Sequence, residues 1–254
     1  MRKLTTAILL FDLMAGLLFL GLWEQRKAEN PGGVLAVETA AKSGGIAESG
    51  SRPEESCETG TEPACDAAQE SKKIALTFDD GPHPCYTDQL LDGLKERGVT
   101  ATFFVTGEHA KLHPDVIKRM QEEGHLIGNH TYSHIQLTGK NREKFKEELV
   151  KTNEVITEIT GEEVLYVRPP YGCWDKSLEE ELNMFPVLWT IDPLDWCSSN
   201  VDCITDRVVS KAGENQIILL HDYYDTSVTA ALKIVDQLLD EGYEFVTVEE
   251  ILLE

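Results

Sequence analysis

The chain has 254 residues, of which 41% are hydrophobic and 27% are charged, and its formal net charge is −22 at pH 7. This length is sufficient for one barrel-sized domain or for two smaller ones. Binding to nucleic-acid phosphates requires clustered Lys and Arg, so the acidic balance argues against a nucleic-acid partner, although it leaves open which neutral sugar or peptide is bound.

An apolar stretch near the amino terminus, residues 5–23, follows Arg2 and Lys3 and contains a single charged residue, Asp12. On an insertion scale, Ile, Leu and Phe contribute about −0.3 to −0.6 kcal/mol each and a central Asp about +2.5 to +3.5 kcal/mol, so membrane insertion stays favourable. No small-x-small cleavage site follows, which favours an uncleaved signal anchor over residues 1–27 against a cleaved signal peptide. We therefore expect an extracytoplasmic protein anchored to the cell membrane, or a secreted one if this segment is cleaved.

Residues 28–72 are rich in Ala, Gly, Ser, Pro and Glu and have few large apolar side chains. Such a segment cannot bury enough surface to offset the entropy that is lost on ordering. We expect an acidic flexible linker that lets residues 73–254 reach away from the bilayer.

From residue 73 onward, short apolar segments alternate with amphipathic ones. The expected strands comprise residues 74–78, 101–105, 126–129, 165–167, 187–191, 216–220 and 244–248. The expected helices comprise residues 87–97, 114–123, 142–160, 203–212 and 227–240. The alternation predicts one α/β domain with a parallel sheet and outer helices, either an open doubly wound sheet or a barrel. In both, reactive side chains belong at the carboxyl ends of the strands.

The first expected strand ends in two adjacent acids, Asp79 and Asp80, and Gly81-Pro82 prevents its continuation. Side chains alternate along extended backbone, so the two carboxylates should point in different directions and can serve different roles. Taken alone, this stretch fits an ordinary turn.

Other expected strands also end in polar residues that could meet at the same edge. These residues are His130 with His134 four residues later, Arg168, Asp192 with Asp195, and His221. Each fits a structural role on its own, as a surface or core histidine, an ion pair or a helix cap. Two histidines at this spacing and one carboxylate, however, form a set that binds a divalent metal and leaves positions open. The coincidence at five strand ends favours a functional site.

The sequence resembles the polysaccharide deacetylase family, the NodB homology domain of carbohydrate esterase family four, over residues 73–254. The five ordered motifs of that family are matched by Thr77-Phe78-Asp79-Asp80-Gly81-Pro82, His130-Thr131-Tyr132-Ser133-His134, Arg168-Pro169-Pro170-Tyr171, Asp192-x-x-Asp195-Trp196 and Leu219-Leu220-His221. The resemblance implies a distorted (β/α)7 barrel with the catalytic loops at the carboxyl ends of its strands.

The resemblance also implies a metal centre. Asp80, His130 and His134 would hold a divalent ion, usually zinc and sometimes cobalt or another ion, which polarises the acetamide carbonyl and lowers the pKa of a bound water. Asp79 would be the general base, with Arg168 orienting it and balancing its charge. The oxyanion would be stabilised by the metal and by a backbone N–H near Tyr171.

On the leaving-group side, His221 would protonate the departing amine, and the charge of Asp192 would keep His221 protonated. Trp196 and Leu219 would form an apolar pocket for the acetyl methyl group. The implied reaction is hydrolysis of N-acetyl groups on an aminosugar polymer with release of acetate.

The motifs do not specify the substrate polymer. Peptidoglycan N-acetylglucosamine is the first candidate because the protein is expected at the cell's own wall, and chitooligosaccharide is the second. N-acetylmuramic acid and an exported polysaccharide are the next candidates. Two other functions stay open, an O-acetyl esterase on a xylan-like polymer and a non-catalytic, membrane-tethered glycan-binding protein. We expect a monomer.

Six cysteines suit an oxidising exterior and allow fifteen pairings. Cys85 and Cys173 each follow a motif and should lie on loops at the active-site face. We hypothesise disulfides between Cys85 and Cys173, between Cys197 and Cys203, and between Cys57 and Cys65.

Overall fold

The computed structural model describes residues 72–253. The expected anchor at residues 1–27, the expected linker at residues 28–72 apart from its last residue, and the hypothesised pair of Cys57 and Cys65 lie outside the described residues. Within residues 72–253, no helix is both long and apolar enough to cross a membrane.

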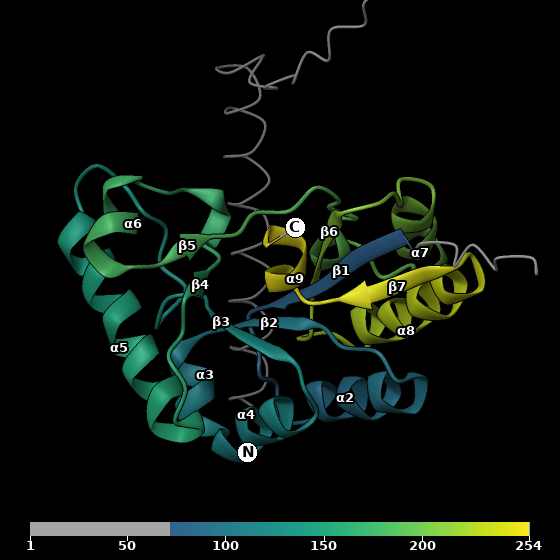
Figure 1. Ribbon diagram of the computed structural model, residues 1–254, viewed down its shortest axis with the longest axis horizontal. Coiled ribbons are helices and arrows are strands. Elements are labelled where there is room, and N and C mark those ends of the chain that lie inside the picture. The colour runs from purple at the N-terminus through teal and green to yellow at the C-terminus, as the bar shows by residue number, and fades with distance from the viewer. Residues whose placement is uncertain (1–71, 254) are drawn as a thin grey trace, which may run out of the picture. The chain divides into compact units, whose positions relative to one another are not determined.

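Strands and helices alternate along the described part of the chain (Figure 1). The strands are β1 (Lys72–Asp79), β2 (Thr102–Val105), β3 (Leu126–Asn129), β4 (Tyr166–Val167), β5 (Phe185–Pro186), β6 (Gln216–His221) and β7 (Tyr243–Val246). The helices are α2 (Tyr86–Arg97), α3 (Gly107–Leu112), α4 (Pro114–Glu122), α5 (Arg142–Thr160), α6 (Ser177–Leu182), α7 (Val201–Val209), α8 (Asp225–Asp240) and α9 (Val248–Leu252). Two short 3-10 helices, η1 (Pro170–Gly172) and η2 (Asp195–Cys197), follow β4 and β5.

The seven strands form one parallel sheet in the order β5-β4-β3-β2-β1-β6, and β7 also pairs with β1. The amino-terminal half of β1 pairs with β7, and its carboxyl-terminal half pairs with β2. The segment after β5 returns to the opposite end of the sheet, where Ile191 forms a bridge with Ile218 of β6. This bridge links the two ends of the sheet, so the predicted α/β architecture with seven parallel strands is confirmed as a curled half-barrel.

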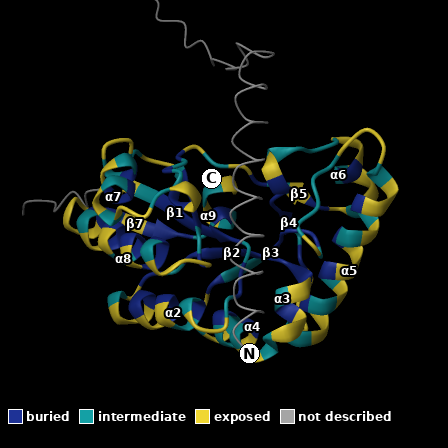
Figure 2. Cartoon of the chain, turned by 180° about the vertical axis from the view of Figure 1, so that it is seen from behind, coloured by how far each residue is buried: buried dark blue, intermediate teal, exposed yellow. Residues whose placement is uncertain are grey.

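Alternation along the strands sorts side chains between two cores. Leu76 and Phe78 of β1 and Phe103 of β2 belong to the core under the outer helices. Ala75 of β1 and Phe104 of β2 belong to a second core inside the curl. Figure 1 shows the helices arranged around the outside of the sheet, and Figure 2 shows buried strands beneath helices with one exposed face. Because β1 alternates, Asp79 lies on the same inner side as Ala75.

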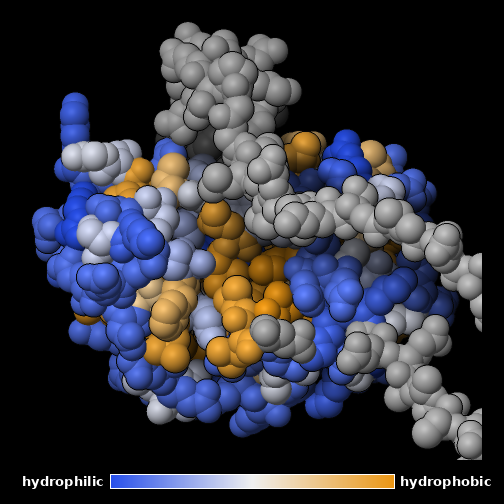
Figure 3. Space-filling model, turned by 45° about the horizontal axis from the view of Figure 1, so that its top comes forward, coloured by the Kyte–Doolittle hydropathy of each residue, from blue (hydrophilic) through white to orange (hydrophobic). Residues whose placement is uncertain are grey.

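Helix α9 covers part of the inner core. Its first residue, Val248, is fully buried beside Ala75 and Phe104, whereas Leu252 at its end is half exposed. A band of hydrophobic surface lies in the middle of the face seen in Figure 3, and hydrophilic side chains surround it. A short helix thus covers part of the inner core on the side opposite the outer helices.

Several element boundaries differ from the sequence-based expectations. Helices α3, α6 and α9 were not expected, because at five or six residues they are too short to show a helical period. The expected strand at residues 187–191 is reduced to the bridge at Ile191, and the regular pairing lies earlier, in β5. The expected strand at residues 244–248 ends at Val246, because Thr247 forms a capping box that starts α9.

Candidate active site

The polar residues singled out in the sequence lie at the carboxyl ends of neighbouring strands. Asp79 is the last residue of β1 and His221 the last of β6, and these two residues are paired in register. His130 directly follows β3, and Arg168 directly follows β4. The parallel sheet therefore brings side chains from distant parts of the sequence to one edge, as expected.

Asp80, His130 and His134 offer ligand atoms that all lie within 4.8 Å of one another. The Nε2 atoms of His130 and His134 lie 3.4 Å and 3.3 Å from Asp80 Oδ1. That oxygen is buried and has no hydrogen-bond partner of good geometry among the described residues, so it is a polar atom that a cation would satisfy. A two-histidine, one-carboxylate set with this geometry fits a divalent metal.

The ligand tautomer of His130 is fixed by the backbone. Its Nδ1 lies 2.6 Å from the carbonyl oxygen of Arg168 and donates to it, which leaves Nε2 to face Asp80. Metal-ligating histidines commonly donate their second ring N–H in this way. A contact between a residue after β3 and one after β4 therefore orients the ring of His130 toward Asp80.

Charges within this cluster set its protonation. Burial alone would raise the pKa of Asp80, but the imidazoles of His130 and His134 outweigh it and hold that pKa below its usual range. Burial lowers the pKa of His134, which favours the neutral ring that ligates metal. Burial would also lower the pKa of His130, but the charges of Asp79 and Asp80 outweigh it and raise that pKa.

Asp79 is held by a fully buried guanidinium. Arg168 Nη1 donates to Asp79 Oδ1 at 2.9 Å and to Thr77 Oγ1 at 2.6 Å. The same side chain donates to the carbonyl oxygens of Val187 and Leu188. The second carboxylate oxygen, Asp79 Oδ2, lies 3.8 Å from His130 Nε2 and so faces the metal ligands. One oxygen is fixed by Arg168, and the other remains available beside the metal set.

His221 is paired with Asp195 rather than with Asp192. Asp195 Oδ1 lies 2.8 Å from His221 Nδ1, and Asp195 Oδ2 accepts from the backbone N–H of His221 at 2.8 Å. Asp192 instead accepts from the N–H of Leu194 at 2.8 Å. Leu194 has a φ of 58°, and the turn that it makes brings the later acid to β6. We predicted that the charge of Asp192 keeps His221 protonated, but the acid in direct contact with His221 is Asp195, and Asp192 interacts with it only through its charge. Two acids in one motif cannot be told apart by spacing.

The contact with Asp195 determines the charge of His221. Burial would lower the pKa of His221, but the hydrogen bond and charge of Asp195 outweigh it, with smaller contributions from Asp80 and Asp79, and raise that pKa to about 9. The imidazole is therefore protonated at neutral pH and can act as an acid.

The remaining predicted site residues lie around this cluster. Tyr171 has a φ of 61° in η1, and its half-exposed ring lies 5.1 Å from the ring of His134, measured between centroids. Trp196 directly follows Asp195 and is half exposed, and Leu219 lies buried in β6 two residues before His221. The oxyanion N–H near Tyr171 and the acetyl pocket of Trp196 and Leu219 stay predictions.

The hypothesised disulfides of the described cysteines are wrong in this structure. Cys85, Cys173, Cys197 and Cys203 are free thiols. Gln89, in the helix that follows Cys85, donates to its sulfur at 3.5 Å, whereas the sulfur of Cys173 accepts from Gln136 in the loop after β3 at 3.2 Å. Loops that share one face of a sheet do not by that alone bring two sulfur atoms together.

Sequence reasoning missed the residues that support the ligands. Asn129 ends β3, accepts from the N–H of Thr131 at 2.8 Å and donates to Leu149 O and Asn153 Oδ1, so it fixes the loop that carries both histidines. Its position directly before His130 was the sequence feature that could have identified it.

A second missed residue is Asp222, which is fully buried next to His221 and accepts from Thr87 Oγ1 at 2.5 Å. Its carboxylate lies against Gly81, so that a Cβ at residue 81 would overlap with it. Burial is the main reason that the pKa of Asp222 is raised to about 7, and the charge of Asp80 adds to the increase.

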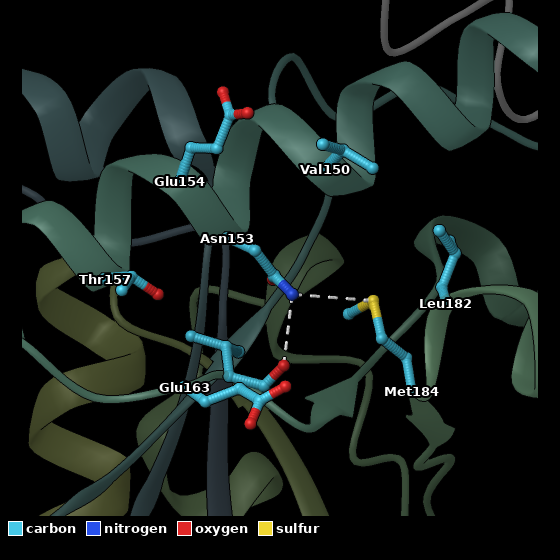
Figure 4. Close-up of a pocket in the computed structure, with 8 residues that line it drawn as sticks. Val150, Asn153, Glu154, Thr157, Glu163, Leu182 and Met184 are labelled. Atoms are coloured by element: carbon cyan, nitrogen blue, oxygen red, sulfur yellow. Dashed lines mark hydrogen bonds between the residues drawn. The ribbon is translucent and has the colours of Figure 1, made fainter.

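A separate pocket of about 280 Å³ opens beside α5 and shares no residue with the cluster (Figure 4). Asn153 points into it from α5 and donates to Val164 O and Met184 Sδ. Because Asn153 also accepts from Asn129, the residue before His130, this pocket adjoins the loop of the two histidines. Its lining includes Glu154 and Glu163, but the group of potential metal ligands among the described residues is that of Asp80, His130 and His134, so we place the chemistry at the strand ends.

Comparison with known proteins agrees with this geometry. The chain matches the polysaccharide deacetylase family model over residues 66–187. It is 43% identical over 180 residues to the peptidoglycan-N-acetylmuramic acid deacetylase PdaC of Bacillus subtilis (strain 168), covering 71% of this chain and 38% of PdaC. The solved structure of PdaC is similar with a TM-score of 0.69 at 42% identity, covering 72% of this chain and 90% of the solved one. The chain thus spans well under half the length of PdaC.

Two further relatives extend the comparison. A family 4 acetyl xylan esterase from Clostridium thermocellum, solved with a cobalt ion, has a TM-score of 0.66 at 33% identity over 71% of this chain and 90% of its own. The chitooligosaccharide deacetylase of Rhizobium leguminosarum bv. trifolii is 38% identical over 198 residues, which cover 71% of this chain and 92% of the relative. At this identity, over nearly the whole of that relative, the chain belongs to the polysaccharide deacetylase family.

Proposed function

We propose that this protein is a metal-dependent hydrolase that removes N-acetyl groups from an aminosugar polymer and releases acetate. The observation that carries the proposal is the arrangement of three groups at one sheet edge. These are the ligand set of Asp80, His130 and His134, the carboxylate of Asp79 beside it, and the protonated His221. Together they offer a metal site, a base and an acid, which are the parts that amide hydrolysis requires.

The ligand set would hold zinc, or else cobalt or another divalent ion. Such an ion supplies a Lewis acid that polarises the amide carbonyl and lowers the pKa of water. Asp79 would accept the proton of the attacking water through Oδ2, because Oδ1 is held by Arg168. The fixed guanidinium keeps Asp79 in place and balances its charge in a buried setting.

His221 would donate its Nε2 proton to the departing amine. Its Nδ1 proton is held by Asp195 at 2.8 Å, so Nε2 is the nitrogen that remains for the substrate. An amine is a poor leaving group unless it is protonated, and the raised pKa of His221 keeps the proton available at neutral pH. The backbone N–H at Tyr171 is our candidate donor to the oxyanion.

For the substrate we propose peptidoglycan N-acetylglucosamine first and chitooligosaccharide second. The named activities of PdaC and of the rhizobial relative support an N-acetylated glycan, although they differ in the sugar. The composition of residues 1–27 supports an anchored protein outside the cytoplasm, where the cell's own wall is the nearest polymer.

A second candidate is the removal of O-acetyl groups from a xylan-like polymer, which the similarity to the acetyl xylan esterase favours. An oxygen leaving group needs less assistance from an acid than an amine does. His221→Ala should therefore lower the rate on amides far more than the rate on esters.

The proposal is tested by measuring acetate release by the full-length protein, with zinc or with a chelator, from a chito-oligomer, from purified peptidoglycan and from acetylated xylan in parallel. Zinc-dependent release from the chito-oligomer or from peptidoglycan supports an N-deacetylase, and the ratio of these two rates identifies the preferred polymer. Release only from acetylated xylan supports the esterase. No release from any of the three by metal-loaded protein would contradict both.

Variants separate the roles of the two adjacent acids. Asp80→Ala and His130→Ala should lose metal binding, measured by calorimetry, together with activity. Asp79→Asn should bind metal and lose catalysis. Asp115→Asn, which changes an exposed acid in the first turn of α4, is the matched control and should behave as the wild type. Loss of metal in Asp79→Asn would reverse the assignment of the two acids.

A further inference from the structure

Beside the proposed catalytic residues lies a cluster of rings that the mechanism does not use. Tyr223 in the β6–α8 loop is its centre, with the ring of His83 at 4.9 Å and that of His109 at 5.8 Å between centroids. Tyr224 lies edge-on to Tyr223 at 5.9 Å, and Tyr86 stacks on His83 at 4.4 Å. The rings come from three separate segments, so the fold and not a local sequence repeat assembles them.

This ring cluster adjoins the active site directly. His109 donates through Nδ1 to the backbone carbonyl oxygen of Asp80 at 2.8 Å, so a metal ligand is supported by a ring that stacks on Tyr223. Tyr223 also follows the general acid His221 by two residues. Tyr223 is thus close to the proposed catalytic residues both along the chain and through His109.

The two tyrosines are presented to solvent by a rigid support. Tyr223 is 39% exposed and Tyr224 is 45% exposed, whereas His83, Tyr86 and His109 beneath them are partly buried. His83 is fixed on both sides, because its Nδ1 accepts from the N–H groups of Cys85 and Tyr86 and its own N–H donates to Thr87 Oγ1 at 2.7 Å. Single exposed aromatics are common, but two adjacent ones on an ordered support form a preorganised binding surface.

The chemistry of this surface suits a neutral sugar. An exposed tyrosine offers an apolar face for the C–H groups of a pyranose ring and a hydroxyl for its polar edge. The ring of His83 adds hydrogen-bonding groups. Burial, together with the charges of His109 and His113, lowers the pKa of His83, which favours its uncharged form.

We propose that Tyr223 and Tyr224, supported by His83 and His109, form a stacking subsite for a pyranose ring adjacent to the sugar that is deacetylated. The inference rests on the proposed function, because it takes the polymer to be a glycan. Binding energy from a sugar that does not react can be used to position the one that does. The enzyme should therefore act better on oligomers than on short fragments.

The test measures affinity rather than turnover. Calorimetric titration of the full-length protein with an N-acetylglucosamine pentamer compares the wild type with Tyr223→Ala, Tyr224→Ala, Tyr223→Phe and the control Phe185→Ala. Phe185 is an exposed aromatic on β5, so its removal should leave the affinity unchanged. Both tyrosine-to-alanine variants should bind about three- to tenfold more weakly, and Tyr223→Phe, which keeps the ring face, should stay near the wild type.

A second measurement does not depend on variants that must fold. In protein labelled with 13C-tyrosine, the ring resonances of Tyr223 and Tyr224 should shift when the pentamer is added, whereas those of buried Tyr243 should not. Wild-type affinity in both alanine variants, or unmoved ring resonances in pentamer-saturated protein, would overturn the subsite. Ring shifts without any acetate release would contradict the proposed catalysis and leave the subsite supported.

Discussion

Replacing Asp195 by Asn should remove the acid function of His221 while keeping its surroundings nearly unchanged in volume. The pKa of His221 is raised from 6.5 to about 9 against the opposing effect of burial. At about 1.4 kcal/mol per pKa unit, the environment favours the imidazolium by about 3 kcal/mol. Asp195 contacts the ring directly, so most of this preference should disappear with its charge.

The hydrogen bonds make the effect of Asp195→Asn specific. Both oxygens of Asp195 accept, one from the backbone N–H of His221 and the other from its Nδ1. An Asn has only one acceptor oxygen, so its amide NH2 must face one of these two donors. The arrangement of lowest energy turns the NH2 toward Nδ1, which then has to be unprotonated. The ring becomes neutral, with its proton on Nε2, and a neutral imidazole is a very weak acid.

The assay is the pH dependence of kcat/KM on a chito-oligomer, together with an NMR titration of the His221 ring. In Asp195→Asn the pKa of His221 should fall to 6.5 or below, so that about a tenth or less of the protein carries the imidazolium at pH 7.5. The basic limb of the rate profile should move down by about 2.5 pH units or more. A bound metal would offset the charges of Asp79 and Asp80, but it would do so equally in wild type and variant.

Asp192→Asn is the matched control, because Asp192 Oδ1 accepts from the N–H of Leu194 and the oxygen of an Asn can do the same. Its rate profile should stay close to that of the wild type. The reasoning would be refuted if Asp195→Asn kept the basic limb of the wild type, or if Asp192→Asn moved it further than Asp195→Asn did.

Three other predictions follow from the buried groups. Gly81→Ala places a methyl group against the carboxylate of Asp222 and should shift the adjacent Asp80, which would weaken zinc binding in calorimetry even in protein that stays folded. Arg168→Met leaves the buried carboxylate of Asp79 uncompensated and should lower the free energy of unfolding by about 3–5 kcal/mol in urea titrations, unless Asp79→Asn accompanies it. The raised pKa of His221 should add stability to the folded state that is fully present below pH 6.5 and is lost as the pH rises through about 9. The free energy of unfolding should therefore be larger at pH 6 than at pH 9.5, and this difference should be smaller in Asp195→Asn.

The sequence was sufficient to predict those features of the structure that depend on hydrophobic periodicity and on the order of elements along the chain. Alternating apolar strands and amphipathic helices predicted the parallel sheet, and the rule for carboxyl ends then placed Asp79, His130, Arg168 and His221 at one edge, as the structure confirms. The glycines after α2 and α5, Gly98 and Gly161, adopt left-handed conformations that end those helices.

Contacts made within loops could not be predicted in the same way. The choice between Asp192 and Asp195 depends on the backbone turn at Leu194, and no periodicity encodes a single φ angle. The cysteine pairing failed for a related reason, because a shared face limits distance only loosely and sulfur atoms need close, specific geometry. Asp222 was not predicted because its role depends on a contact with Gly81, a residue that is distant from it in the sequence.

Two of the proposed metal ligands, Asp80 and His134, and the loop residue Thr131 have a backbone conformation that is unfavourable for residues other than glycine. Asp80, Thr131 and His134 have φ values of 75°, 63° and 55°, in the left-handed region where each non-glycine residue costs about 1–3 kcal/mol. Hydrogen bonds hold two of these positions, from His109 to the carbonyl of Asp80 and from the N–H of Thr131 to Asn129. The conformation that aims the ligands at one point is thus sustained by Asn129 and His109, which take no part in the reaction. Substituting either should release the loop and lower metal affinity before it lowers the stability of the sheet.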